Sequence, residues 1–229
     1  MKKTKLHTRY KIKKALIPGV TTIIGSQLGW NKQPLIAWAR REAIAGNDPT
    51  KVRDKAAEIG TLCHLLIKRH IANALTKNLD IDDVIDGYAD IYGEYSASAI
   101  TRGKTAYLAF MDWENENNPR YMQNEVVVIH KRYRYGGTFD LLAKVNDKIT
   151  LIDFKTGNGF YPEYIIQLAA YYNALPATLK RKTTAWQILQ IDKDTGDFHL
   201  HNITNKSIDD GWRAFKYLRR LYDLQKMMK

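Results

Sequence analysis

The sequence predicts an α/β or α+β fold, in which a helical first half precedes a central mixed sheet flanked by helices. Three observations predict it. Apolar residues recur at helical spacing through much of residues 1–120. From about residue 121 the chain instead carries short apolar runs typical of about five strands. One helical segment, residues 162–175, interrupts these runs after the third strand, so helices are expected on both faces of the sheet.

The first two helices follow from their start and stop residues. Thr21 or Thr22 is a candidate cap for a short helix that ends near Gly29. The next helix begins with a proline suited to a first turn and ends at the Gly-Asn-Asp-Pro stop of residues 46–49.

A longer helix is predicted from the apolar residues that recur between Val52 and Leu75, with Thr50 as its cap. Residues 81–100 and 104–117 also read as helices. The first half of the chain is therefore expected to be mainly helical.

Five strands and a final helix follow. The strands are predicted at residues 124–135, 136–145, 148–154, 184–192 and 197–203. A basic helix is expected over about residues 206–226. No repeat or linker-like composition divides the chain. We therefore expect a single domain over residues 1–229, with a helical part (1–120), a sheet core (121–205) and a basic C-terminal helix (206–229).

The second and third strands form a predicted hairpin around the turn residues Asn146 and Asp147. A two-residue loop places Asp140 opposite Asp153, and Thr138 opposite Lys155. Opposed residues share a face, with Cβ atoms about 4.5–5.5 Å apart. The other face would be packed core, made of Phe139, Leu141, Ala143, Val145, Ile152 and Phe154.

Two carboxylates at this spacing call for a counter-ion. Two negative charges about 5 Å apart repel by about 3 kcal/mol at an effective dielectric constant near 20. Protonation of one acid relieves the repulsion, and so does a divalent cation. Oxygen ligands favour Mg²⁺ or Mn²⁺ over zinc. The alternative is that one aspartate lies at an exposed strand edge in another register.

The charge of the chain indicates a polyanionic partner. The formal net charge is +12, and residues 1–14 hold seven Lys or Arg and no acid. Nucleic acid is the partner that best explains this bias, and generic surface charge is the alternative. The single cysteine, Cys63, excludes an internal disulfide framework and fits an intracellular, cytoplasmic location. No apolar run is long enough for a membrane span, and the N-terminus lacks the apolar core of a signal peptide.

Several of these residues resemble a known family. The motifs GTFD (137–140), IDFKTG (152–157) and YPEYIIQLAAYYNAL (161–175) resemble the PD-(D/E)XK nuclease superfamily, in particular the RecB-like branch of phage and mitochondrial exonucleases. The resemblance extends to a Gly-x-x-x-His pattern at Gly60 and His64, and implies a restriction-endonuclease-like core. Thr-Phe-Asp stands where the superfamily name has a proline, and residues 176–229 carry no transferable motif.

The resemblance implies a metal-binding hairpin. Asp140 and Asp153 would be metal ligands, together with the backbone carbonyl of Phe154. Lys155 would orient the attacking water and stabilise charge on the phosphate. The reaction would be in-line attack of a metal-activated hydroxide on phosphorus.

Residues outside the hairpin would complete the site. Glu125 would ligate the metal directly or through water, and His64 would complete its shell, with Gly60 leaving room for the imidazole. Gln167 would hold Lys155 or a phosphate, and Tyr171 would contact the substrate. For each of these residues the alternative is an ordinary packing or surface role.

The substrate implied by charge and resemblance is DNA. The candidate DNA contacts are Lys131, Arg132, Arg134, Tyr164, Arg213, Lys216, Arg219 and Arg220. For the basic residues, the alternative is a solvated face.

The expected function is a Mg²⁺- or Mn²⁺-dependent deoxyribonuclease, most simply an exonuclease of recombination, replication or end processing. A recombination or replication protein is a candidate partner, and the resemblance to phage proteins favours a phage-encoded enzyme. The alternatives are a structure-specific or restriction-like endonuclease and a non-catalytic nucleic-acid-binding protein with the same fold. The sequence leaves strand polarity, the number of metal ions and the oligomeric state open.

Overall fold

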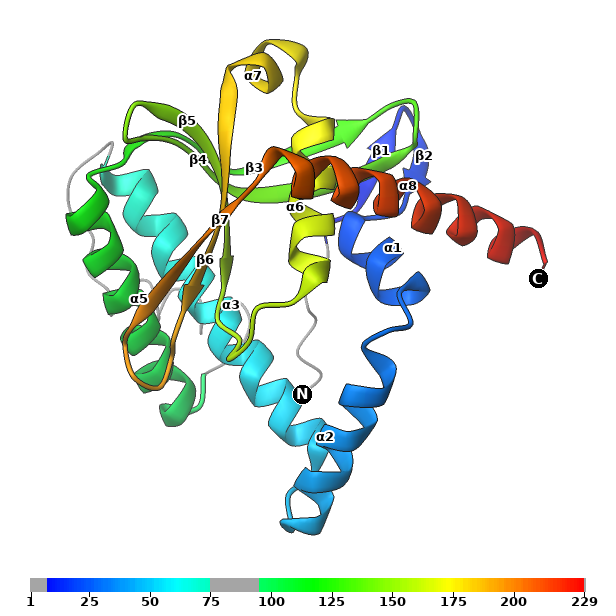
Figure 1. The fold of residues 1–229 in the computed structure, drawn as a ribbon. Helices are drawn as coiled ribbons and strands as arrows, with labels where there is room; N and C mark the ends of the chain where they lie inside the picture. Colours follow the sequence, from blue (N-terminus) through cyan, green and yellow to red (C-terminus); the bar gives the residue numbers. More distant parts are fainter. Residues whose placement is uncertain (1–7, 75–94, 229) are drawn as a thin grey trace.

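A five-stranded sheet with helices on both faces organises the computed structural model, which describes residues 8–74 and 95–228 (Figure 1). The strands lie in the order β3-β4-β5-β6-β7. Strands β5 and β6 run parallel, and the other neighbouring pairs run antiparallel. Their bounds are β3 Arg120–His130, β4 Tyr135–Val145, β5 Lys148–Lys155, β6 Thr183–Ile191 and β7 Phe198–Ile203. The predicted mixed sheet flanked by helices is confirmed.

Most helices match the predicted segments, but α5 continues through the break that was predicted between residues 100 and 104, and there is a short extra helix, α7. They are α1 Val20–Gln27, α2 Lys32–Ile44, α3 Pro49–Ala74, α5 Ala97–Asn117, α6 Pro162–Ala174, α7 Ala177–Lys182 and α8 Asn205–Met227. The predicted cap of α3 was wrong, because the Asp48 carboxylate accepts the N–H groups of Thr50 and Lys51, at 2.8 and 3.3 Å. Residues 81–94 of the predicted acidic helix lie outside the described residues. None of the helices in the described ranges combines the length and apolarity needed to cross a membrane.

The strand prediction was wrong at the end of β3 and near the N-terminus. The first sheet strand ends at His130 rather than Tyr135, and residues 131–134 form the turn into β4. Near the N-terminus, β1 Tyr10–Ile12 and β2 Ala15–Ile17 form a small antiparallel sheet that the sequence analysis did not predict.

The sheet separates two hydrophobic cores. Leu141 and Ala143 pack in the core that α3 and α5 cover, whereas Leu142 packs in the core that α1, α6 and α8 cover. Phe139 lies in the second core, so its predicted place beside Leu141 was wrong. Because alternate residues of a regular strand share a face, the strand must be distorted at Asp140, between them.

The hairpin has the predicted register, but it ends before the aspartates. Asn146 and Asp147 both adopt positive φ, at 46° and 63°, as a two-residue hairpin turn requires. The paired residues run from Val145↔Lys148 to Leu141↔Ile152. Asp140 and Asp153 come next but are not paired, and neither are Thr138 and Lys155. On the other side of β4, Glu125 has a φ of 52° and interrupts the pairing with Asp140. The sheet is therefore open on both sides of Asp140.

Candidate active site

The Asp140 carboxylate occupies the gap where the strands separate. Its Oδ2 accepts a hydrogen bond from the backbone N–H of Phe154 at 2.7 Å, in the part of β5 that the β4–β5 pairing does not reach. Its Oδ1 lies 3.5 Å from Nδ1 of His64 on α3. The buried carboxylate thus satisfies a backbone donor and presents its other oxygen to α3.

Three side chains from three elements form a cluster with the donor atoms of a metal site. His64, Glu125 and Asp140 each offer one ligand atom, and these atoms lie within 4.8 Å of one another. Glu125 Oε1 is 3.9 Å from His64 Nδ1, and the His64 side chain keeps 31% of its surface accessible. One imidazole nitrogen and two carboxylate oxygens are a donor set that suits a divalent cation.

The electrostatics of this cluster require a positive charge. Burial lowers the pKa of His64, but the carboxylates of Asp140 and Glu125 outweigh burial and raise that pKa to about 10. Burial raises the pKa of Asp140, but the His64 charge and hydrogen bond outweigh it and lower that pKa overall. In the protein alone, the single imidazolium charge offsets part of the charge of the two acids. A divalent cation would supply the same compensation, so the residues fit such an ion.

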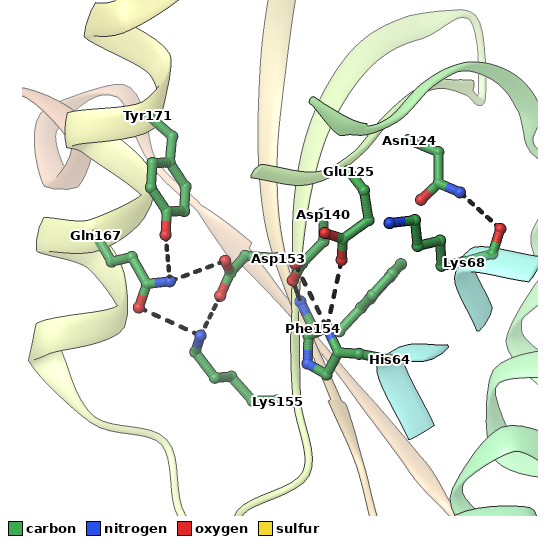
Figure 2. A network of polar contacts seen from close by, with 10 residues as sticks. All are labelled: His64, Lys68, Asn124, Glu125, Asp140, Asp153, Phe154, Lys155, Gln167 and Tyr171. Atoms are coloured by element: carbon green, nitrogen blue, oxygen red, sulfur yellow. Dashed lines mark hydrogen bonds and ion pairs between the residues drawn. The ribbon is translucent and has the colours of Figure 1, made fainter. Parts of the chain in front are cut away.

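The second aspartate lies on the α6 side of the first and has other partners (Figure 2). Asp153 Oδ2 pairs with Lys155 Nζ at 2.5 Å, and Asp153 Oδ1 accepts from Gln167 Nε2 at 3.2 Å. Lys155 Nζ in turn donates to Gln167 Oε1 at 3.3 Å. The three side chains form a closed ring of contacts that fixes the lysine.

The charge of Asp140 acts on Asp153. Burial raises the pKa of Asp153 most, the Asp140 charge adds to it and Lys155 opposes it, with a result of about 6. The predicted cross-strand pairing of Asp140 with Asp153 was wrong, and each acid faces a different helix. The three-residue cluster of donor atoms includes Asp140 and does not include Asp153.

Two of the sequence-based expectations, those for Tyr171 and Gly60, need correction. Tyr171 is 4% exposed, and a Cβ on Gly137 would lie 2.4 Å from its ring, so burial leaves it no surface for the expected substrate contact. Its hydroxyl accepts a hydrogen bond from Gln167 Nε2 at 2.9 Å, so Tyr171 helps to position Gln167 instead. A Cβ on Gly60 would meet Thr156 at 3.0 Å, so this glycine makes room for the loop after β5 rather than for His64.

Most of the predicted DNA contacts gather away from this site. Tyr164 is the exception, because its ring lies 4.9 Å from Lys155 Nζ. Six others line one cavity between the 131–134 turn and α8, namely Arg132, Arg134, Arg213, Lys216, Arg219 and Arg220. Lys131 is not among the residues that line it. Arg219 is 7% exposed and bound to neighbouring groups, so its expected role as a direct phosphate contact does not fit.

One side chain near the site was not singled out by the sequence analysis. Figure 2 shows the Lys68 ammonium pointing toward Glu125, while the Lys68 carbonyl accepts from Asn124 Nδ2 at 2.9 Å. Lys68 follows His64 by four residues on α3, and residues four apart lie on one helix face. That four-residue spacing from His64 was the signal in the sequence that could have identified Lys68.

Comparison with known proteins identifies one family. The model of the PD-(D/E)XK nuclease superfamily matches residues 35–227. No curated protein matches.

Similar solved structures are distant in sequence. A protein from Eubacterium rectale, provisionally described as an exonuclease, is 13% identical with a TM-score of 0.46, over 71% of this chain and 64% of its own. This chain thus spans less than two thirds of that protein. An alkaline exonuclease from Laribacter hongkongensis is 14% identical with a TM-score of 0.34, over 70% of this chain and 92% of its own. Its complex with dAMP is 18% identical with a TM-score of 0.36, over 73% and 95%.

Proposed function

Because this chain belongs to the PD-(D/E)XK nuclease superfamily, we propose that it is a Mg²⁺- or Mn²⁺-dependent deoxyribonuclease that acts as an exonuclease on DNA ends. The observation that carries the proposal is the convergence of His64, Glu125 and Asp140 beside the Asp153–Lys155 pair. The net charge of +12 supports DNA as the substrate. The enzyme would act in recombination, replication or DNA-end processing.

The residues divide into a metal-holding group and a lysine-holding group. His64, Glu125 and Asp140 would hold the divalent ion, with Asp153 and the carbonyl of Phe154 as further ligands. When bound, such an ion lowers the pKa of a water ligand and neutralises charge on the phosphate.

In this proposal, the lysine-holding group would present one cation to the reacting phosphate. Asp153 and Gln167 contact Lys155 Nζ from two directions, so the ammonium group has a defined position before the substrate arrives. From there it can donate to the attacking water or to a phosphate oxygen. Preorganised donors of this kind lower the barrier because they need no rearrangement during the reaction.

A cleavage assay with a charge-removing variant tests the proposal. End-labelled linear DNA should be degraded with Mg²⁺ or Mn²⁺ and left intact with EDTA. Asp153→Asn should reduce the rate by about 100-fold or more, because it removes the charge that holds Lys155. Asp147→Asn, in the exposed turn of the same hairpin, is the matched control and should keep full activity. Equal activity of Asp153→Asn and Asp147→Asn would contradict the assignment.

The same assay separates the alternatives. An exonuclease cannot start on a closed circle, so circular DNA should persist while linear DNA disappears. Cleavage of the circle would identify an endonuclease. DNA binding without cleavage under any metal would identify a non-catalytic binding protein.

A further inference from the structure

A basic pocket lies between the β3–β4 turn and α8, outside the candidate active site. Its volume is about 520 Å³, and Asp223 is the acid in its lining. Five cations with accessible surface also line it, namely Arg132, Arg134, Arg213, Lys216 and Arg220. The fold thus brings two basic segments that are distant in sequence into one concave surface.

The walls of the basic pocket are fixed by internal contacts. Arg219 donates from Nε to the Tyr133 carbonyl at 2.8 Å and pairs with Asp223. The Trp212 ring packs edge-on against the Tyr133 ring, with centroids 5.3 Å apart. Arg219 and Asp223 neutralise each other and tie the turn to the helix. The pocket therefore keeps its shape without a ligand. The positive charge of the other five residues can act on a bound ligand.

The remaining cations have little compensation within the protein. Arg213 lies 3.3 Å from Asp210, a contact of two exposed groups. Within residues 8–74 and 95–228, no carboxylate lies at ion-pair distance from Arg132, Arg134 or Arg220. Arginine is suited to phosphate because its planar guanidinium donates two parallel hydrogen bonds. Several such groups around one hollow suit a ligand with more than one phosphate.

We propose that the basic pocket is a second DNA-binding site, which holds the phosphate backbone of the substrate at a distance from the catalytic centre. This inference rests on the proposed function. Arg134, in the turn just before β4, precedes Asp140 by six residues, which corresponds to at most about 20 Å of extended chain. One strand of a duplex carries a phosphate every 3.4 Å or so, so about six base pairs span both sites. Shorter substrates reach only the catalytic centre.

The test removes charge from the basic pocket and leaves its frame intact. The triple variant Arg132→Gln, Arg134→Gln, Arg220→Gln retains Arg219 and Asp223. In EDTA, its affinity for a labelled 20-base-pair duplex should fall about tenfold or more, and the slope of log affinity against log salt should fall by about two to three. The loss of kcat/KM with metal should be about fivefold greater on the 20-base-pair duplex than on a trinucleotide.

A second triple variant controls for net charge. Lys148→Gln, Arg181→Gln, Lys182→Gln removes three exposed cations near α7 and the β4–β5 turn. It should bind the duplex at least severalfold more tightly than the pocket variant. Equal losses in the two variants, or equal losses on long and short substrates, would overturn the proposal.

Two further results separate the possible failures. If the pocket variant does not fold by circular dichroism, the pair Lys216→Gln, Arg220→Gln on α8 replaces it in the same comparison. If the wild-type protein neither binds nor cleaves DNA, the proposed function itself fails. If the wild type cleaves and the pocket variant matches the control, only the second site fails.

Discussion

Two tyrosine rings close on the glycine pair that precedes Asp140. A Cβ on Gly136 would lie 2.4 Å from the Tyr10 ring, and a Cβ on Gly137 would lie 2.4 Å from the Tyr171 ring. Tyr10 also hydrogen-bonds the Thr138 hydroxyl at 3.0 Å. The missing side chains therefore allow both rings to reach β4, next to the strand residues that carry the site.

Gly137→Ala should destabilise the protein and lower its activity. The added methyl group overlaps the buried Tyr171 ring, and overpacking of this kind costs about 1–3 kcal/mol. Gly25→Ala is the matched control, because no atom lies within 4 Å of its added Cβ and alanine favours the helix by up to about 1 kcal/mol. Urea unfolding of both variants measures the free energies. Equal stability of Gly137→Ala and wild type would show that the ring has room to move.

Gln167→Ala should act on turnover rather than on substrate binding. Gln167 contacts both Asp153 and Lys155, so its loss should leave the ammonium group poorly placed. We expect kcat to fall about tenfold or more, with KM for DNA nearly unchanged. Asn173→Ala, also on α6 but in contact with Ala169 and Lys180, is the control. A rise in KM at constant kcat would instead assign Gln167 to substrate binding.

At the scale of single residues, the sequence predicts which acids meet but not how they face. The hairpin turn fixes the register from Val145↔Lys148 to Leu141↔Ile152, but the pairing ends there, and Asp140 and Asp153 are not paired. The break at Glu125, whose φ is 52°, leaves no mark in the sequence, because glutamate is not a residue that favours left-handed backbone. The prediction therefore assigned Phe139 to the wrong core. It also placed the two acids on one face, whereas they have different partners.

At the scale of elements, a polar network joins α3, α5 and β3. His70 Nε2 lies 2.9 Å from Glu114 Oε2, and His70 Nδ1 lies 2.9 Å from the Tyr107 hydroxyl. Tyr121 donates to the other oxygen of Glu114. Since α3 carries His64, the network also fixes the helix that supplies the imidazole of the site.

The contribution of Glu114 should depend on pH. Burial raises its pKa, but the hydrogen bonds from His70 and Tyr121 outweigh burial and bring it below the usual 4.5. A carboxyl group with a lowered pKa stabilises the fold above its unfolded pKa, and this stabilisation is lost as pH falls. Glu114→Gln should therefore cost about 1 kcal/mol at pH 7 and progressively less below pH 4.5. Urea unfolding from pH 3.5 to 7 measures the difference, with Glu116→Gln on the exposed face of α5 as control. A difference that is constant with pH would contradict the lowered pKa.

An element could be predicted where clear start and stop residues mark its ends. Helices α2 and α3 were predicted because Gly-Asn-Asp-Pro separates them. The β3–β4 turn, Lys-Arg-Tyr-Arg at 131–134, has no glycine, asparagine or proline and reads as more strand. Strands β1 and β2 were missed because they are three residues each within a lysine-rich stretch.

At the scale of the whole molecule, two cores share one sheet. The core under α3 and α5 contains Phe110, and the core under α1, α6 and α8 contains Phe215. Strand β4 contributes Leu141 to the first core and Leu142 to the second. Loss of either core removes the packing of the strands that support the other.

This shared sheet leads us to expect one cooperative unfolding transition, in keeping with the proposed single domain. Phe110→Leu and Phe215→Leu each replace a fully buried ring with a smaller side chain. Each should lower the free energy of unfolding by about 1–2 kcal/mol. Each should lower the same calorimetric midpoint by about 3–6 °C. Phe160→Leu is the control, because its ring is 38% exposed. Two transitions, each sensitive to only one of the buried substitutions, would show that the helical half and the C-terminal helices unfold as separate units. In that case the proposed site residues, which come from α3 as well as from β3, β4 and β5, would be divided between the two units.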